Sequence, residues 1–139
     1  MHSPPALAVP RAPLLVRRDA RGALIKAHPE AVLGEVYVVE LLPGQPRGEH
    51  RHRWSGEWFA PLQGACWLLV RCPDTGAEAL LKLDGERAFV AAGLGHALWA
   101  ADGAPALVLA AADRAHPAEG TEPMPLLAGR SWPDLPVRP

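Results

Sequence analysis

The sequence predicts an all-β protein, built as a sandwich or a barrel, and three observations support this class. Short apolar runs alternate with turn residues at intervals of about eight to twelve residues, as in sheets of short strands. Glycine and proline are frequent, at 13 and 16 residues, and many of them separate these runs. No long stretch has the apolar period of an amphipathic helix, which is about 3.6 residues.

The expected strands lie between residues 14 and 112. In chain order they are residues 14–17, 23–26, 35–42, 58–62, 65–71, 77–83, 87–91, 96–101 and 106–109. Residues 19–22 read Asp-Ala-Arg-Gly and predict a turn between the first two strands. The Asp84-Gly85 pair predicts a β-hairpin between residues 77–83 and 87–91, because this dipeptide suits a two-residue turn.

Two alanine-rich segments, residues 91–101 and 106–112, could instead be helices on propensity alone. Gly93 and Gly95 interrupt the first segment, and Pro105 directly precedes the second. Glycine weakens a helix and proline removes a backbone donor, so these residues favour strands in both segments.

Both ends of the chain are rich in proline and are expected to be extended arms, not helices. The prolines concerned are Pro4, Pro5, Pro10 and Pro13 at one end and Pro123, Pro125, Pro133, Pro136 and Pro139 at the other. With 139 residues, of which 49% are apolar, the chain suits one hydrophobic core. We expect a single domain over residues 1–139, with its core at about residues 14–112.

Composition and charge exclude several classes of protein. The formal net charge is -1, and the 14 basic residues are spread along the chain, unlike the concentrated basic surface of a nucleic-acid binder. No apolar run approaches the ~20 residues needed to cross a bilayer. The N-terminus lacks the basic start and apolar stretch of a signal peptide. We therefore expect a cytoplasmic protein with a small-molecule substrate and with neither nucleic-acid nor membrane partners.

His50 and His52 are separated by one residue, and Glu57 follows five residues after His52. Side chains at positions i and i+2 of a strand point to the same face, so the two imidazoles can act together. Two imidazoles beside a carboxylate form half of a metal site or of an acid/base site. His96, which follows a glycine-rich turn, can complete the site from a separate strand. Three imidazoles and one carboxylate suit Zn, Fe, Mn, Ni or Cu.

These residues resemble the two sequence motifs of the cupin superfamily. The matching positions are Gly44, His50, His52, Glu57 and Gly64 in the first motif and Gly85, Gly93 and His96 in the second. Ala91 and Ala100 stand where the second motif has proline and asparagine, and neither position is a metal ligand in the family. The resemblance implies a double-stranded β-helix, which is the cupin jelly-roll barrel, with the site inside it. The metal ligands that it implies are His50, His52, Glu57 and His96.

A narrower resemblance is to the nucleotide-sugar branch of the cupins. It rests on Asp19-x-Arg21-Gly22, followed by Arg47-Gly48-x-His50-x-His52. This branch includes dTDP-4-dehydrorhamnose 3,5-epimerases, dTDP-sugar 3,4-ketoisomerases and the C-terminal cupin of capsule-synthesis reductases. The resemblance implies an isomerase or epimerase of polysaccharide biosynthesis that acts on a dTDP- or UDP-linked 4-keto sugar. Ketoisomerases usually have glutamine at the position of Glu57 and need no metal, so Glu57 indicates a metal-bearing member.

Isomerisation of a 4-keto sugar removes a proton from the carbon next to the ketone. His50 is a suitable base, since an imidazole with a pKa near ~6.5 works close to neutral pH. Tyr37 could donate to the enolate or return the proton, and a metal could polarise the ketone. The planar guanidinium of Arg47 could hold a diphosphate. Stacking on a base or sugar could come from Trp58, or from Trp54 or Trp99.

Several alternatives stay open at the level of the sequence. A histidine bound to metal has used the lone pair that a base needs, so His50 is either a ligand or the base. In the first case Tyr37 or a metal-bound hydroxide must remove the proton. The same ligands also suit a metal-dependent dioxygenase or another small-molecule cupin enzyme, and the fold suits a non-catalytic sugar- or metabolite-binding protein. The proline-rich arms could be exchanged between subunits, and we expect a homodimer.

Overall fold

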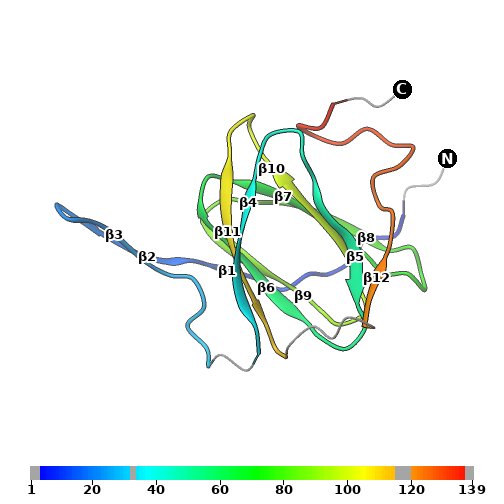
Figure 1. Cartoon of the computed structure of the whole chain (residues 1–139), viewed down its shortest axis with the longest axis horizontal. Helices are drawn as coiled ribbons and strands as arrows, with labels where there is room; N and C mark the ends of the chain where they lie inside the picture. Colours follow the sequence, from blue (N-terminus) through cyan, green and yellow to red (C-terminus); the bar gives the residue numbers. More distant parts are fainter. Residues whose placement is uncertain (1–3, 32–33, 115–119, 137–139) are drawn as a thin grey trace.

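The computed structural model describes residues 4–31, 34–114 and 120–136, and these residues form twelve β strands. The β6 sheet has the strand order β1 (Arg11–Pro13), β9 (Glu86–Val90), β6 (Glu57–Gln63), β11 (Ala106–Ala112) and β4 (Val36–Leu41). The β10 sheet has the strand order β12 (Thr121–Pro123), β5 (Arg47–His52), β10 (Gly95–Ala100), β7 (Cys66–Arg71) and β8 (Glu78–Leu83). The remaining pair is the hairpin of β2 (Leu15–Asp19) and β3 (Gly22–Lys26), which projects away from the two sheets in Figure 1.

An apolar core fills the space between the two sheets. Leu68 and Leu98 enter it from the β10 sheet, and Phe59 and Val108 enter it from the β6 sheet. All four side chains are buried, because alternate residues of each strand face the opposing sheet. The expected all-β class, with two antiparallel sheets packed face to face, is confirmed.

The two alanine-rich segments are strands, as predicted. β10 pairs with β5 and β7, and β11 pairs with β4 and β6, so each is a central strand. All six residues of β10 are buried. A strand covered on both faces has a continuous apolar sequence, which explains the ambiguity with a helix. Within the described residues, no helix has the length and apolar character needed to span a membrane.

The predicted β-hairpin at Asp84-Gly85 is wrong. β8 pairs with β7 in the β10 sheet, whereas β9 pairs with β6 and β1 in the β6 sheet. Gly85 does have the left-handed conformation of a tight turn, with φ of 71°. Leu83 and Ala88, on either side of this turn, enter the core from opposite sheets. The turn therefore carries the chain across the barrel, because a turn signal does not specify which sheet the next strand joins.

Both proline-rich arms lie along the barrel of their own chain. β1 pairs with β9, and β12 pairs with β5 at one side of the β10 sheet. Both strands fall outside residues 14–112, so the two sheets extend beyond the range expected for the core. The chain after β12 continues beside the β10 sheet, as the orange and red trace of Figure 1 shows. Pro139 lies outside the described residues.

Residues 124–136, here called the C-terminal segment, cover a second apolar cluster on the outer face of the β10 sheet. Leu69 and Trp99 are fully buried in this cluster, where they pack with Leu126. The indole of Trp99 donates a hydrogen bond to the backbone oxygen of Pro133. The C-terminal segment is therefore an integral layer of the fold.

Leu126→Ala should lower the free energy of unfolding by about 2–5 kcal/mol, because it leaves a cavity beside Trp99. Urea unfolding followed by tryptophan fluorescence measures the change. Leu42→Ala is the matched control, since Leu42 is 49% exposed and Leu126 only 1%. The control should change the free energy by less than about 0.5 kcal/mol. Equal stability of Leu126→Ala and the wild type would contradict the packing of the C-terminal segment.

Candidate metal centre

Three imidazoles meet between the sheets, on the inner face of the β10 sheet. His50 and His52 come from β5, and His96 comes from β10, where it lies directly opposite His50. The ring centroid of His50 lies 4.6 Å from that of His52 and 4.9 Å from that of His96. His52 and His96 are almost completely buried, with 8% and 2% of their surface exposed, whereas His50 is partly buried. The alternation of side chains along β5 thus places His50 and His52 on one face.

A β-bulge at Glu49 sets which side chains of β5 face inward. The register against β10 shifts so that His96 faces His50 while Ala97 faces Gly48. Gly48 and Glu49 both have positive φ, at 92° and 54°. A Cβ atom at Gly48 would lie 2.8 Å from the backbone oxygen of His96, so glycine is required there.

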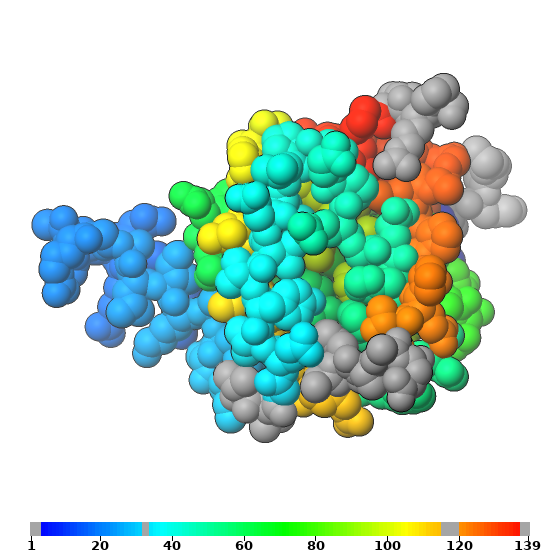
Figure 2. All heavy atoms as spheres, viewed as in Figure 1, coloured from blue at the N-terminus to red at the C-terminus, as the bar shows by residue number. Residues whose placement is uncertain are grey.

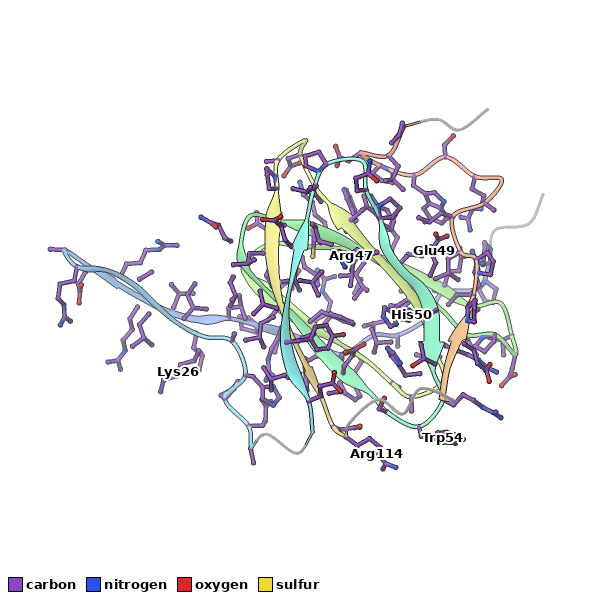
Figure 3. The ribbon with its side chains drawn as sticks, in the orientation of Figure 1. Lys26, Arg47, Glu49, His50, Trp54 and Arg114 are labelled. Carbon is purple, nitrogen blue, oxygen red and sulfur yellow. The ribbon has the colours of Figure 1, made fainter. Side chains whose placement is uncertain are left out.

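The bulge returns Arg47 to the face of β5 that carries His50. Simple alternation would send a side chain three positions from His50 to the opposite face. Arg47 instead pairs with Leu98, which faces the core. Figure 3 shows Arg47 and His50 on the barrel side of β5, and Glu49 on the side of the C-terminal segment. Arg47 is exposed and lines a surface hollow together with Glu40, Leu42, Gln45 and Pro46.

Glu57 reaches the histidines from the opposite sheet. Residues 53–56 carry the chain from β5 to β6, and the Asp113 carboxylate holds this connection by accepting the Gly56 amide at 3.1 Å. Glu57 is 1% exposed, and its Oε1 lies 3.5 Å from Nε2 of His52 and 3.6 Å from Nε2 of His96. The five-residue spacing from His52 to Glu57 is therefore the length of one crossing between the sheets.

The three histidines form a cluster that could hold a metal ion. One ring nitrogen of each lies within 4.8 Å of those of the other two. Neutral imidazoles are ligands for divalent transition metals, and Glu57 adds an anionic oxygen beside two of them. A buried carboxylate is unfavourable without an opposite charge, and a cation among these groups would supply it. The residues present therefore fit a divalent transition metal.

Tyr37, on β4, is bonded to the carboxylate beside this cluster. Its hydroxyl donates a hydrogen bond to Oε2 of Glu57 at 2.8 Å. Burial, and then the negative charge of Glu57, raise the pKa of Tyr37 above its usual value. The phenol is therefore protonated at neutral pH, and it holds Glu57 with the other oxygen toward the histidines. The catalytic role expected for Tyr37 stays a prediction.

The tryptophans considered for stacking lie away from the cluster. Trp58 follows Glu57 on β6 and points to the outer face, where the guanidinium carbon of Arg87 lies 3.9 Å from its ring centroid. Trp99 is buried beneath the C-terminal segment, and Trp54 is 48% exposed in the loop after β5. Because neighbouring residues of a strand face opposite sides, the structure does not bring Trp58 to the histidines.

Two further residues contact the cluster and were not indicated by the sequence analysis. The ring centroid of Phe59 lies 5.1 Å from that of His96. Thr121, on β12, is hydrogen-bonded through Oγ1 to Nδ1 of His52 at 2.9 Å. Alternation along β6 could have indicated Phe59, which lies two residues after Glu57. No such signal exists for Thr121, because it lies 69 residues from His52 in a tail without a motif.

Comparison with known proteins gives matches only among solved structures, since no protein-family model and no curated protein matches the chain. A dTDP sugar isomerase from Desulfovibrio desulfuricans G20 matches with a TM-score of 0.77 at 20% identity, over 92% of this chain and 90% of that one. ChmJ, a 3'-monoepimerase from Streptomyces bikiniensis in complex with dTDP-quinovose, matches with a TM-score of 0.78 at 17% identity, over 94% and 79%. A 3,4-ketoisomerase from Helicobacter canadensis matches with a TM-score of 0.65 at 18% identity, over 81% and 88%.

These similarities establish the fold of the chain. Each match covers at least 81% of it, whereas the sequence motifs span only residues 44–100. The predicted double-stranded β-helix is confirmed, and the resemblance to the nucleotide-sugar branch of the cupins is confirmed at the level of the fold. The similarity to nucleotide-sugar epimerases and ketoisomerases is distant, at identities of 17–20%.

Tyr37 is the only tyrosine of the chain, so absorbance of the phenolate reports its ionisation directly. In the metal-free folded protein, little phenolate should form as the pH rises through ~10, whereas the chain unfolded in urea should ionise there. The pKa of Tyr37 is higher in the folded protein than in the unfolded chain. Tyr37 therefore contributes stability below pH ~10 that is lost as the pH rises further. The free energy of unfolding should therefore fall more steeply above pH ~10 in the wild type than in Tyr37→Phe, by up to about 1.4 kcal/mol per pH unit.

Comparing the wild type with Tyr37→Phe removes the contribution of the other titrating groups, because it is the same in both proteins. Burial raises the pKa of the Cys66 thiol to about 12, and this affects both proteins equally. A folded wild type that forms phenolate at the same pH as the unfolded chain would contradict the buried hydrogen bond to Glu57.

Proposed function

We propose that the protein is an isomerase or epimerase that acts on a nucleotide-linked 4-keto sugar and carries a divalent transition metal such as Zn, Fe, Mn or Ni. One observation carries the proposal, namely the convergence of three imidazoles and the Glu57 carboxylate between the sheets. The support for the substrate class is the fold shared with a dTDP sugar isomerase and with an epimerase in complex with dTDP-quinovose. The nucleotide would be dTDP, as in that complex, or UDP, which the sequence resemblance also implies.

Burial separates the roles that we assign to the four groups. His52, His96 and Glu57 are almost completely buried, and Oε1 of Glu57 is close to both rings, so we assign these three to the cation. His50 is the most exposed of the four, and we assign it to proton removal, since one lone pair cannot serve a metal and a proton together. When bound, the cation would act as a Lewis acid on the ketone.

The proton transfer follows from this arrangement. His50 takes a proton from the carbon next to the ketone, and the electron pair of that bond moves to the ketone oxygen, which gives an enolate. A proton delivered from water to the opposite face of the same carbon gives an epimer, and His50 releases the proton it took to the solvent. Arg47 shares the inner face of β5 with His50, and its planar guanidinium suits the diphosphate of the nucleotide. Tyr37 keeps Glu57 oriented during these steps.

A dTDP- or UDP-linked 4-keto sugar incubated with the protein in deuterium oxide should gain deuterium at the carbon next to the ketone. His50→Gln should slow this exchange by at least about 100-fold, the usual contribution of a general base, and should keep the metal. His96→Gln should lose the metal, because a ligand is removed. His28→Gln is the matched control, since His28 lies beside Glu30 and outside the cluster. Mass spectrometry of the sugar and metal analysis of the same preparations give both readouts.

The two readouts separate the ways in which the proposal can fail. Absence of exchange with every such sugar would remove the isomerase proposal. Loss of metal from His50→Gln would make His50 a ligand and assign proton removal to another group. Full metal content in His96→Gln would contradict the ligand set.

We also propose that the protein is a homodimer, and the support comes from the hairpin of β2 and β3. Figures 1 and 2 show this hairpin projecting from the barrel. Leu15 and Leu24 share one of its faces and are each 55% exposed. An isolated two-stranded hairpin is marginally stable in water, so a second copy that covers this face would stabilise it. We assign the contact to the hairpin instead of the proline-rich arms, because both arms pack on their own barrel.

Leu24→Glu should convert the dimer to a monomer, because it places a charge in the proposed contact. Light scattering of the eluate from size-exclusion chromatography should give twice the chain mass for the wild type and the chain mass for this variant. Leu80→Glu, at a position that is 39% exposed on β8, is the matched control and should remain dimeric. A monomeric wild type, or a dimeric Leu24→Glu, would contradict the assignment.

A further inference from the structure

β12 lies beside the strand that carries two of the three histidines. In the pairing of β12 with β5, Thr121 is directly opposite His52, and Glu122 is opposite Arg51. Directly opposed residues of an antiparallel pair point to the same face, so Thr121 projects toward the inner side with His52. Thr121 Oγ1 and His52 Nδ1 are 2.9 Å apart, which is a normal hydrogen-bond distance.

This hydrogen bond fixes which nitrogen of His52 faces the cluster. Nδ1 is held toward Thr121, and Nε2 then lies 3.5 Å from Oε1 of Glu57. A rotation of the ring by half a turn would break the bond to Thr121 and would turn Nε2 away from Glu57. When Nε2 of an imidazole binds a cation, Nδ1 carries the remaining proton and needs an acceptor, and a hydroxyl oxygen can be that acceptor.

The C-terminal segment is tied to the same strand at a second point. The carboxylate of Glu49, the residue of the β-bulge, accepts the amides of Leu126 and Leu127 at 3.3 Å and 3.2 Å. The backbone oxygen of Glu49 accepts the amide of Met124 at 2.8 Å. These bonds hold the chain that follows β12 against β5, so the position of Thr121 is determined by more than the three residues of β12.

We propose that Thr121 is a positioning residue of the metal centre, which orients His52 and accepts the Nδ1 proton when Nε2 binds a divalent cation. The inference rests on the metal centre under the proposed function, and it adds a residue from outside the motifs that indicated that centre. It also makes the affinity for metal depend on β12 and the C-terminal segment.

The test uses the full-length protein with Thr121→Val, which removes the hydroxyl and keeps the shape, and with Thr121→Ser, which keeps the hydroxyl. Affinity for Zn²⁺ is measured by competition with a chelator. Thr121→Val should weaken binding by about 10–100-fold, the usual effect of losing the partner of a ligating histidine. Thr121→Ser should restore binding to within about threefold of the wild type. Proton NMR of the Zn²⁺-loaded protein should show a slowly exchanging Nδ1 proton of His52 in the wild type and in Thr121→Ser, and not in Thr121→Val.

Glu122→Gln is the matched control for general loosening of β12. Glu122 is the next residue of the strand and forms ion pairs with Arg51 and Arg53, outside the cluster. Its substitution should leave the affinity for Zn²⁺ within about threefold of the wild type. The inference is overturned if Thr121→Val binds as well as the wild type, or if Glu122→Gln weakens binding equally. A wild type that binds no Zn²⁺ is a different result, and it overturns the metal centre itself.

Discussion

The pairing of β5 with β10 is the constraint on which the candidate site depends. It places His50 opposite His96, and a slip of one residue would turn both histidines of β5 to the outer face, because side chains alternate along a strand. The bulge at Glu49 opposes such a slip, since its left-handed conformation and the close approach at Gly48 are specific to these positions. The inward direction of Arg47 and the docking of the C-terminal segment on Glu49 both follow from this register.

The two sheets contribute different chemistry to the site. The β10 sheet supplies the three imidazoles, whereas the β6 sheet supplies the Glu57 carboxylate together with its donor, Tyr37. Neither sheet forms the site alone, so the site is complete only when the two sheets are packed together. A phenol donates to one oxygen of this carboxylate, and two imidazole rings lie beside the other. Residues 53–56 connect the two sheets, so Glu57 reaches the imidazoles only five residues after His52 in the sequence.

Sequence patterns predicted correctly the features that depend only on the geometry of a single strand. The spacing of His50 and His52 was sufficient to place them on one face, because it depends only on alternation along a strand. The hairpin expected at Asp84-Gly85 was wrong, since the sheet that a strand joins is decided by the packing of the whole barrel. Simple alternation would also have misplaced Arg47. Gly48 is a local signal of a bulge, because glycine inside a strand often marks one, but it does not specify which residue is skipped. The contact of Thr121 with His52 could not be predicted either, since it depends on pairing between strands far apart in the chain.

β12 has a further consequence for the behaviour of the chain in solution. Without it, β5 would be the edge of the β10 sheet and would present a row of unpaired backbone groups, which is a template for self-association. β12 itself is a poor template, because it has three residues and ends at Pro123, which has no amide proton to donate. Removal of β12 together with the C-terminal segment would therefore leave an unpaired edge on the strand that carries two of the histidines. Aggregation and loss of the site would then begin at the same place in the molecule.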